Sequence, residues 1–135
     1  MIRCVRIWTS DRHDSIFEEG TLDLSHGERD DVLSDVIGVV SVSFRETRAG
    51  GVFAWHDAPA RQLVLNLSGT LDFKNRRNEH FTLYPGDVLF AEDTTGSGHS
   101  WALVDDKPWH RAYLILAADA PVPFLPNAKS QLKEQ

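Results

Sequence analysis

The chain has 135 residues, 41% of them hydrophobic and 25% charged, and a formal net charge of −6 at pH 7. This length accommodates one domain with a single core, and the composition is normal for a globular protein. Nucleic acids and anionic membranes need clustered Lys and Arg, so the acidic balance argues against both as partners. The adjacent basic pair Arg76 and Arg77 lies among Asn and Glu residues, which is typical of a hairpin tip.

The cysteine content and the first residues bear on the cellular compartment. A single cysteine, Cys4, forms no internal disulfide, so nothing in the sequence indicates an oxidising environment. Arg3 and Arg6 interrupt the apolar run that a signal peptide requires, and no apolar stretch approaches the roughly 20 residues that span a bilayer. We therefore expect a cytoplasmic protein without a membrane partner.

Short β-prone runs separated by turn residues dominate the chain, which is typical of an antiparallel barrel or sandwich. Residues 25–31 are expected to form a loop, residues 30–35 could add one helical turn, and Gly38 marks a bend. No segment keeps a helical period, which argues against a fold of alternating parallel strands and helices. Strands are predicted at residues 3–8, 15–24 (one or two strands), 36–46, 52–56, 62–67, 70–74, 80–83, 87–92, 99–104 and 109–116.

These elements predict an all-β fold in which antiparallel strands close into a double-sheet jelly-roll barrel. A single domain is expected over residues 1–118. Residues 119–135 contain prolines and end in polar residues, so we expect a C-terminal tail on the surface.

Two motifs stand out between residues 50 and 99. The first combines a glycine pair, His56, the amide of Gln62 six residues later, and a glycine that ends a predicted strand. The second combines a Pro-Gly-Asp turn at residues 85–87 with a glycine-rich loop that leads to His99. This pattern resembles the two motifs of the cupin family, small β-barrels that often hold a metal ion in the barrel mouth. The resemblance implies a cupin jelly-roll, also called a double-stranded β-helix.

The resemblance covers most of the chain from about Arg3 onward, and two short strings make it more specific. A Trp-His-x-Ala-Pro string begins at Trp55, and a Glu-Asp-Thr-Thr-Gly-x-Gly-His string ends at His99. Both are similar to those of a group of small, largely uncharacterised bacterial cupins. The chain departs from the usual cupin pattern in a loop two residues longer, and in Ala58 and Gln62, where a histidine and a glutamate are usual.

The alternation of side chains along a strand places Gln62, Val64 and Asn66 on one face. The resemblance implies that His56, Gln62 and His99 point into the barrel mouth. The residues then expected in the wall, in contact with a small-molecule ligand, are Val64, Asn66 and Trp101.

Two neutral imidazoles with open positions suit a divalent metal such as Fe, Mn, Zn or Ni. The expected ligands are His56 and His99, with Gln62 as a weak third ligand because an amide oxygen carries no formal charge. The alternative is that both histidines are barrel residues satisfied by hydrogen bonds, and that Gln62 only orients His56.

The loop before His99 has two interpretations. Asp93 and the following threonines and glycines can form turns, which explains them structurally. Alternatively, the carboxylate of Glu92 or Asp93 lies at the site as a replacement ligand or a general base. The loop lacks the Lys-Ser/Thr that follows a phosphate-binding loop, so no nucleotide cofactor is expected.

The sequence leaves two functions open. One is a cupin that binds a small organic molecule, with a weakly held metal and, if it is an enzyme, chemistry of the oxygenase, isomerase or lyase type. The other is a non-catalytic binding or sensor module that has lost metal competence, as Ala58 and Gln62 suggest. No residue is assigned a catalytic role, and whether the protein is an enzyme stays open.

A row of three leucines on one strand is relevant to whether the protein forms oligomers. Leu63, Leu65 and Leu67 share the face opposite Gln62, and both faces of a barrel wall cannot point inward. This row needs cover from the N-terminal strands or from a second subunit. Twofold dimers are the commonest oligomers, so a homodimer is predicted.

Overall fold

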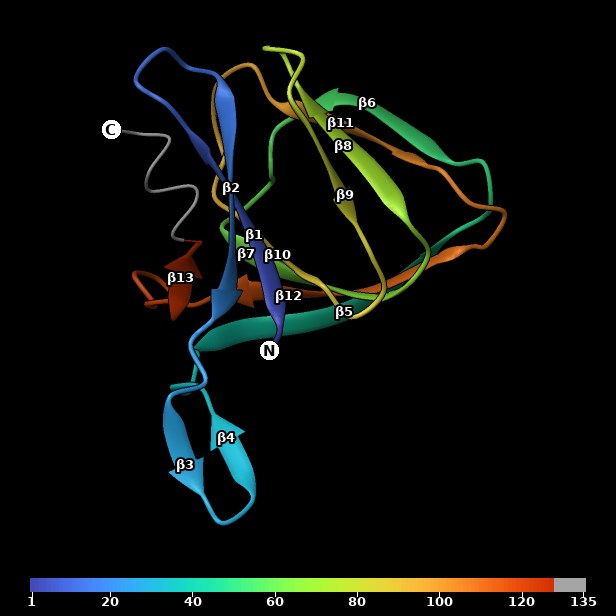
Figure 1. Ribbon diagram of the computed structural model, residues 1–135. Coiled ribbons are helices and arrows are strands. Elements are labelled where there is room, and N and C mark those ends of the chain that lie inside the picture. Colours follow the sequence, from blue (N-terminus) through green and yellow to red (C-terminus); the bar gives the residue numbers. More distant parts are fainter. Residues whose placement is uncertain (128–135) are drawn as a thin grey trace.

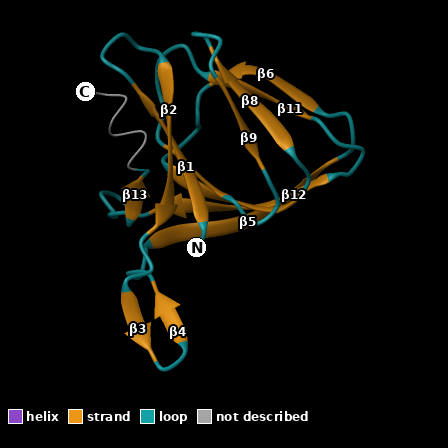
Figure 2. Ribbon diagram, viewed as in Figure 1, coloured by secondary structure: helices purple, strands orange, loops and turns teal. Residues whose placement is uncertain are grey.

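A computed structural model of the chain describes residues 1–127, and all of its regular secondary structure is β (Figures 1 and 2). The first seven strands are β1 (Arg3–Thr9), β2 (Ser15–Leu22), β3 (His26–Glu28), β4 (Asp31–Leu33), β5 (Val39–Thr47), β6 (Val52–His56) and β7 (Gln62–Ser68). The others are β8 (Leu71–Asn75), β9 (His80–Leu83), β10 (Val88–Ala91), β11 (His99–Leu103), β12 (Trp109–Leu116) and β13 (Phe124–Pro126).

The strands form two main sheets that enclose the core. The larger sheet has the order β13-β2-β1-β10-β7-β12-β5, and the smaller has the order β6-β11-β8-β9. All neighbouring strands are antiparallel except β1 and β10, which are parallel. This two-sheet arrangement confirms the predicted all-β jelly roll.

The main core lies between the two sheets and follows the alternation of side chains along each strand. The larger sheet contributes residues such as Ile7, Val64 and Leu89, and the smaller sheet contributes Phe73 and Trp101. A side chain that points inward on one strand packs against inward-pointing side chains of the facing sheet. The core therefore depends on both sheets at once.

A second apolar cluster covers the outer face of the larger sheet. It includes Cys4, Leu63 and Phe90, with Phe124 from the C-terminal segment packed against it. The thiol of Cys4 is fully buried, and burial raises its pKa to about 12, so it stays protonated at neutral pH. Part of the predicted leucine row is thus covered by the chain itself, because Leu63 is buried while Leu67 stays exposed.

The C-terminal segment differs from the predicted tail. Phe124–Pro126 form β13, which pairs with β2 at the edge of the larger sheet. Apolar side chains of this segment fill the outer cluster, which explains why it adds to the sheet instead of leaving the surface. Residues 128–135 lie outside the described residues.

The segment after β2 also differs from expectation. Instead of a loop with a helical turn, β3 and β4 form a two-stranded hairpin that extends away from the barrel (Figure 1). Arg29 at its turn has a φ of +58°. One isolated helical turn gains too few hydrogen bonds to form, so the prediction of a helical turn is wrong.

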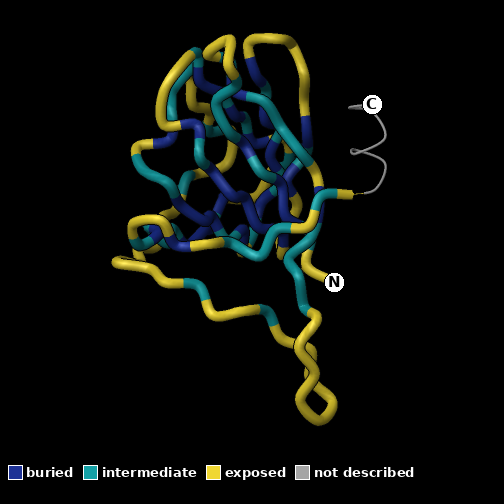
Figure 3. The backbone as a smooth tube through the Cα atoms, turned by 90° about the vertical axis from the view of Figure 1, so that its left-hand side faces the viewer, coloured by how far each residue is buried: buried dark blue, intermediate teal, exposed yellow. Residues whose placement is uncertain are grey.

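The hairpin and β5 are exposed along their length (Figure 3). β5 is an edge strand that pairs only with β12, and β6 is an edge strand of the other sheet. Within residues 1–127, no helix is long and apolar enough to cross a membrane.

Candidate functional site

A cavity of about 340 Å³ lies between the two sheets. Its wall comes from β5, β7, β10 and β12 of the larger sheet and from β6, β8 and β11 of the smaller one. Ligand-binding pockets measure about 300–1,000 Å³ and combine apolar walls with a few polar groups, so this cavity has the size of a site for a small molecule.

The cavity opens on one side of the barrel. Its exposed lining residues are Ser43 and Arg45 on β5, Phe53 on β6, and Pro59 in the loop that follows β6. Because β5 and β6 are edge strands of different sheets, no backbone hydrogen bonds close the space between them. A ligand would therefore enter between β5 and β6.

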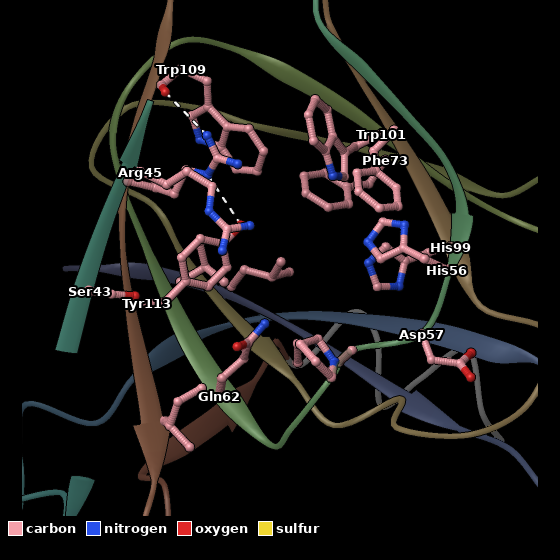
Figure 4. Close-up of a pocket in the computed structure, with 18 residues that line it drawn as sticks. Ser43, Arg45, His56, Asp57, Gln62, Phe73, His99, Trp101, Trp109 and Tyr113 are labelled. Atoms are coloured by element: carbon pink, nitrogen blue, oxygen red, sulfur yellow. Dashed lines mark hydrogen bonds between the residues drawn. The ribbon is translucent and has the colours of Figure 1, made fainter. Parts of the chain in front are cut away.

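Two histidines lie side by side in the cavity wall. His56 ends β6, His99 begins β11, and the two residues are partners in the register of these strands. Their ring centroids are 4.5 Å apart, with 60° between the ring planes. Figure 4 shows both rings on one side of the cavity, next to Trp101 and Phe73.

Gly98 allows this close approach. Its φ is +76°, and a Cβ at this position would lie 2.4 Å from the carbonyl oxygen of His56. Only glycine combines a left-handed backbone with so close a contact. β11 therefore begins directly against the end of β6, which sets His99 opposite His56.

Each histidine uses its Nδ1 for a hydrogen bond within the protein. Nδ1–H of His56 donates to the carbonyl oxygen of Ala54 at 2.8 Å, and Nδ1–H of His99 donates to Oδ2 of Asp93 at 2.5 Å. A ring that donates through Nδ1 keeps the lone pair on Nε2, and no residue among 1–127 bonds either Nε2. Both Nε2 atoms are thus free to accept a proton, a hydrogen bond or a metal.

The surroundings of His56 determine its charge. Burial lowers the pKa of His56 below its ordinary value, and the neighbouring His99 lowers it further, although the bond to Ala54 opposes the shift. His56 is therefore neutral near pH 7 and acts as an acceptor through Nε2.

Asp93 lies behind His99. Its side chain is fully buried and accepts hydrogen bonds from Ser15 Oγ at 2.6 Å and from His99. Its other oxygen, Oδ1, is buried and has no hydrogen-bond partner among the described residues 1–127. Asp93 does not line the cavity, so it acts on a ligand only through His99, whose ring it orients.

The other predicted site residues divide into two groups. Gln62, Val64 and Trp101 line the cavity, as does Ala58. The other two, Asn66 and Glu92, do not line the cavity and form hydrogen bonds or ion pairs elsewhere. Asn66 accepts a bond from Trp109 Nε1 at 3.0 Å and donates to the carbonyl oxygen of Gly69, and Glu92 bridges Arg6 and Arg61 at 2.7 Å each.

Sequence reasoning missed the wall formed by β12 and β5. Trp109, Arg111 and Tyr113 of β12 line the cavity together with Ser43 and Arg45 of β5. The available signal was a charged residue, Arg111, on the face of the strand that otherwise carries Trp109, Tyr113 and Ile115. The pairing that brings Arg45 beside it is set by long-range register.

The donor set does not complete a cupin metal centre. Across residues 1–127, no three or more His, Cys, Asp or Glu side chains are grouped to hold a metal ion. His56 and His99 supply two nitrogen ligands, and the third candidate, Gln62, offers an uncharged amide oxygen. Metal centres in proteins ordinarily take three or more protein ligands, so this pair alone falls short.

Comparison with known proteins found similarity among solved structures only. No protein-family model matches the chain, and no curated protein matches it either. Among solved structures, the chain is similar to the Cupin_2 domain of an XRE family transcriptional regulator from Enterobacter cloacae. Sequence identity is 20% and the TM-score is 0.32, over 87% of this chain and 98% of that one. A similarity at this level says nothing about a ligand. The strand order described above defines the chain as a small jelly-roll barrel with an internal cavity.

The Asp93–His99 pair generates a first prediction. Replacing Asp93 by Asn removes the charge from two buried hydrogen bonds, so the free energy of unfolding should fall by about 1–3 kcal/mol. Urea denaturation measures this loss, and the nitrogen chemical shifts of His99 report its change of tautomer. Asp57→Asn is the matched control, because this carboxylate lines the cavity without a hydrogen bond to either histidine. Equal stability and unchanged His99 shifts in Asp93→Asn would contradict the assigned role.

Proposed function

We propose that the chain binds a small organic molecule in the barrel cavity, with His56 and His99 as hydrogen-bond acceptors. The observation that carries this proposal is the pair of unbonded Nε2 atoms in a wall made largely of aromatic rings. The rings of Phe73, Trp101 and Trp109 provide apolar contact, and the histidines provide orientation. Few polar groups in an apolar enclosure are typical of ligand sites.

A second candidate function is acid–base catalysis, which the Asp93–His99 pair favours. A buried carboxylate that holds Nδ1–H of an imidazole leaves Nε2 as a proton acceptor facing the ligand. Isomerases and lyases use such a group to remove a proton from their substrate. Oxygenase chemistry has less support here, because it would require a metal centre that these residues do not complete. The non-catalytic alternative uses the same cavity without turnover.

Binding in the cavity is tested by tryptophan fluorescence and thermal shift with a library of small organic molecules. Because Trp101 and Trp109 line the cavity, bound compounds should change the emission and raise the melting temperature. The double variant His56→Ala, His99→Ala should weaken binding at least tenfold. His80→Ala serves as the control, since His80 is exposed and bonded to Asp72 outside the cavity. If no compound shifts the wild-type protein, the proposal is wrong.

We also propose that a divalent ion binds weakly at His56 and His99, two ligands that by themselves fall short of an ordinary metal centre. Gln62→Glu adds a charged oxygen of nearly the same shape, so affinity for Mn²⁺ or Zn²⁺ should rise at least tenfold, or about 1.4 kcal/mol. Isothermal titration calorimetry on untagged protein measures the change. The gain should disappear when His99→Ala is added. An unchanged affinity in Gln62→Glu would mean that this position does not share a site with the histidines.

We also propose that the chain forms a homodimer through the outer face of β5. Val40, Val42 and Phe44 are 68%, 54% and 75% exposed on this edge strand, and Leu67 is 55% exposed on the same side. Phe44 and Leu67 line a shallow groove together. Long apolar edge strands left open promote association, and a twofold contact would cover this one.

The dimer is tested by light scattering at micromolar concentration. The wild-type protein should have the mass of two chains, and Phe44→Glu should have the mass of one. Leu125→Glu is the matched control, because Leu125 is 48% exposed on β13 at the opposite edge of the same sheet. A monomeric wild-type protein would refute the dimer.

A further inference from the structure

Arg111 is a buried cation without an acidic partner. It lies in the middle of β12 with 2% of its surface exposed, and it lines the cavity. Its Nη1 donates to Thr47 Oγ1 at 2.7 Å, and its Nε donates to the hydroxyl of Tyr113 at 3.2 Å. Its guanidinium carbon lies 3.7 Å from the centre of the Trp109 ring. No carboxylate among residues 1–127 forms an ion pair with Arg111, and none of their acceptors bonds its Nη2.

A buried cation without an acidic partner lowers the stability of the folded protein, so its presence calls for a functional reason. Removing a cation from water is strongly unfavourable, and charged side chains are almost never fully buried without a partner. Burial lowers the pKa of Arg111, yet a guanidinium remains protonated at neutral pH. The Trp109 ring offsets part of the cost, because its face attracts cations. The charge itself nevertheless stays uncompensated inside the barrel.

A second arginine increases the local charge. Arg45 on β5 is the register partner of Arg111 across the β5–β12 pair. It lies over the Tyr113 ring at 4.9 Å, exposed at the opening of the cavity, without an ion-pair partner among residues 1–127. Like charges directly opposite each other destabilise a sheet. A ligand group that interacts with both Arg45 and Arg111 would explain why these two residues are neighbours.

The charge of the cavity differs from that of the whole chain. The chain carries a formal charge of −6, whereas the cavity lining contains two arginines against one acidic residue, Asp57. Figure 4 shows Asp57 on the side of the histidines, and Arg45, Tyr113 and Trp109 on the other side. The β5–β12 wall is thus a positive region that faces the Nε2 acceptors across an aromatic space.

We propose that the cavity binds a small organic acid, whose carboxylate pairs with Arg111 and whose apolar body packs against Trp101 and Trp109, two rings in edge-to-face contact with centroids 4.6 Å apart. This inference rests on the proposed small-molecule site and specifies its ligand class. Nη2 has no acceptor among residues 1–127, so it is the nitrogen that can donate a charge-assisted hydrogen bond to a carboxylate oxygen. Arg45 at the opening attracts the incoming anion. A hydroxyl or other donor at the far end of the ligand bonds the Nε2 atoms of His56 and His99.

The experiment compares acids with their neutral counterparts. The probes are 4-hydroxybenzoate, phenylacetate and 4-methylpentanoate, each against its primary amide, which has nearly the same shape without the charge. Binding is measured by tryptophan fluorescence and calorimetry. At least one acid should bind ten or more times tighter than its amide. Inorganic phosphate should compete only at far higher concentration, because it lacks the apolar body.

The variant Arg111→Met keeps the volume of the side chain and removes its charge. It should abolish the preference for the acid while leaving the melting temperature of the free protein unchanged or higher, since a buried unpaired cation has been removed. Arg76→Met is the matched control, because Arg76 lies 3.8 Å from the Trp55 ring centre but outside the cavity lining. If Arg111→Met does not fold, Arg45→Gln replaces it and should reduce the preference several-fold.

The outcomes separate the two proposals. If neither acids, amides nor library compounds bind, the small-molecule site itself is refuted. If amides bind as tightly as acids, or if Arg111→Met keeps the preference, the site stands and the organic-acid assignment fails. Displacement of 4-hydroxybenzoate by equimolar phosphate would also overturn that assignment, in favour of simple anion binding.

Discussion

The larger sheet is buried on both faces at its centre and exposed at its β5 edge, and this asymmetry governs the rest of the structure. Around β1, β10 and β7, inward side chains pack in the core and outward side chains pack under the C-terminal segment. At β5 the outward side chains are exposed, and the inner face of β5 and β12 borders the cavity. The centre of the larger sheet therefore stabilises the fold, whereas side chains next to its β5 edge are available to contact a ligand.

Two buried side chains near the site each lack one expected interaction partner among residues 1–127, and each lowers the stability of the fold. On the β6–β11 side, Asp93 keeps one carboxylate oxygen without a partner while it orients His99. On the β12 side, the buried Arg111 holds a positive charge, and no carboxylate of residues 1–127 pairs with it. Each unsatisfied group would weaken a protein that had only to fold, and proteins usually retain such groups where they serve binding or catalysis. Arg111 lines the cavity, and Asp93 is connected to it through His99, which is why we place the proposed site in this cavity.

The face of the strand on which a side chain lies was predictable from the local sequence pattern. Strict alternation placed Gln62 and Val64 on the inward face, and the two motifs brought His56 and His99 to the cavity. The same alternation placed Asn66 inward, but its bond to Trp109 takes it out of the wall. The two-residue repeat of a strand determines the face on which a side chain lies. It does not determine which residue that side chain contacts.

The sequence by itself determined the all-β class and most strand positions, because these follow from short-range periodicity. The resemblance of its two motifs to those of cupins implied the histidine pair. Only the tertiary structure decided that Glu92 bridges two arginines while the adjacent Asp93 supports His99. It also decided that Arg45 and Arg111 meet across strands separated by 61 residues of chain, from Thr47 at the end of one to Trp109 at the start of the other. Such contacts depend on strand order and register, which are set by the collective burial of both sheets and not by any local signal.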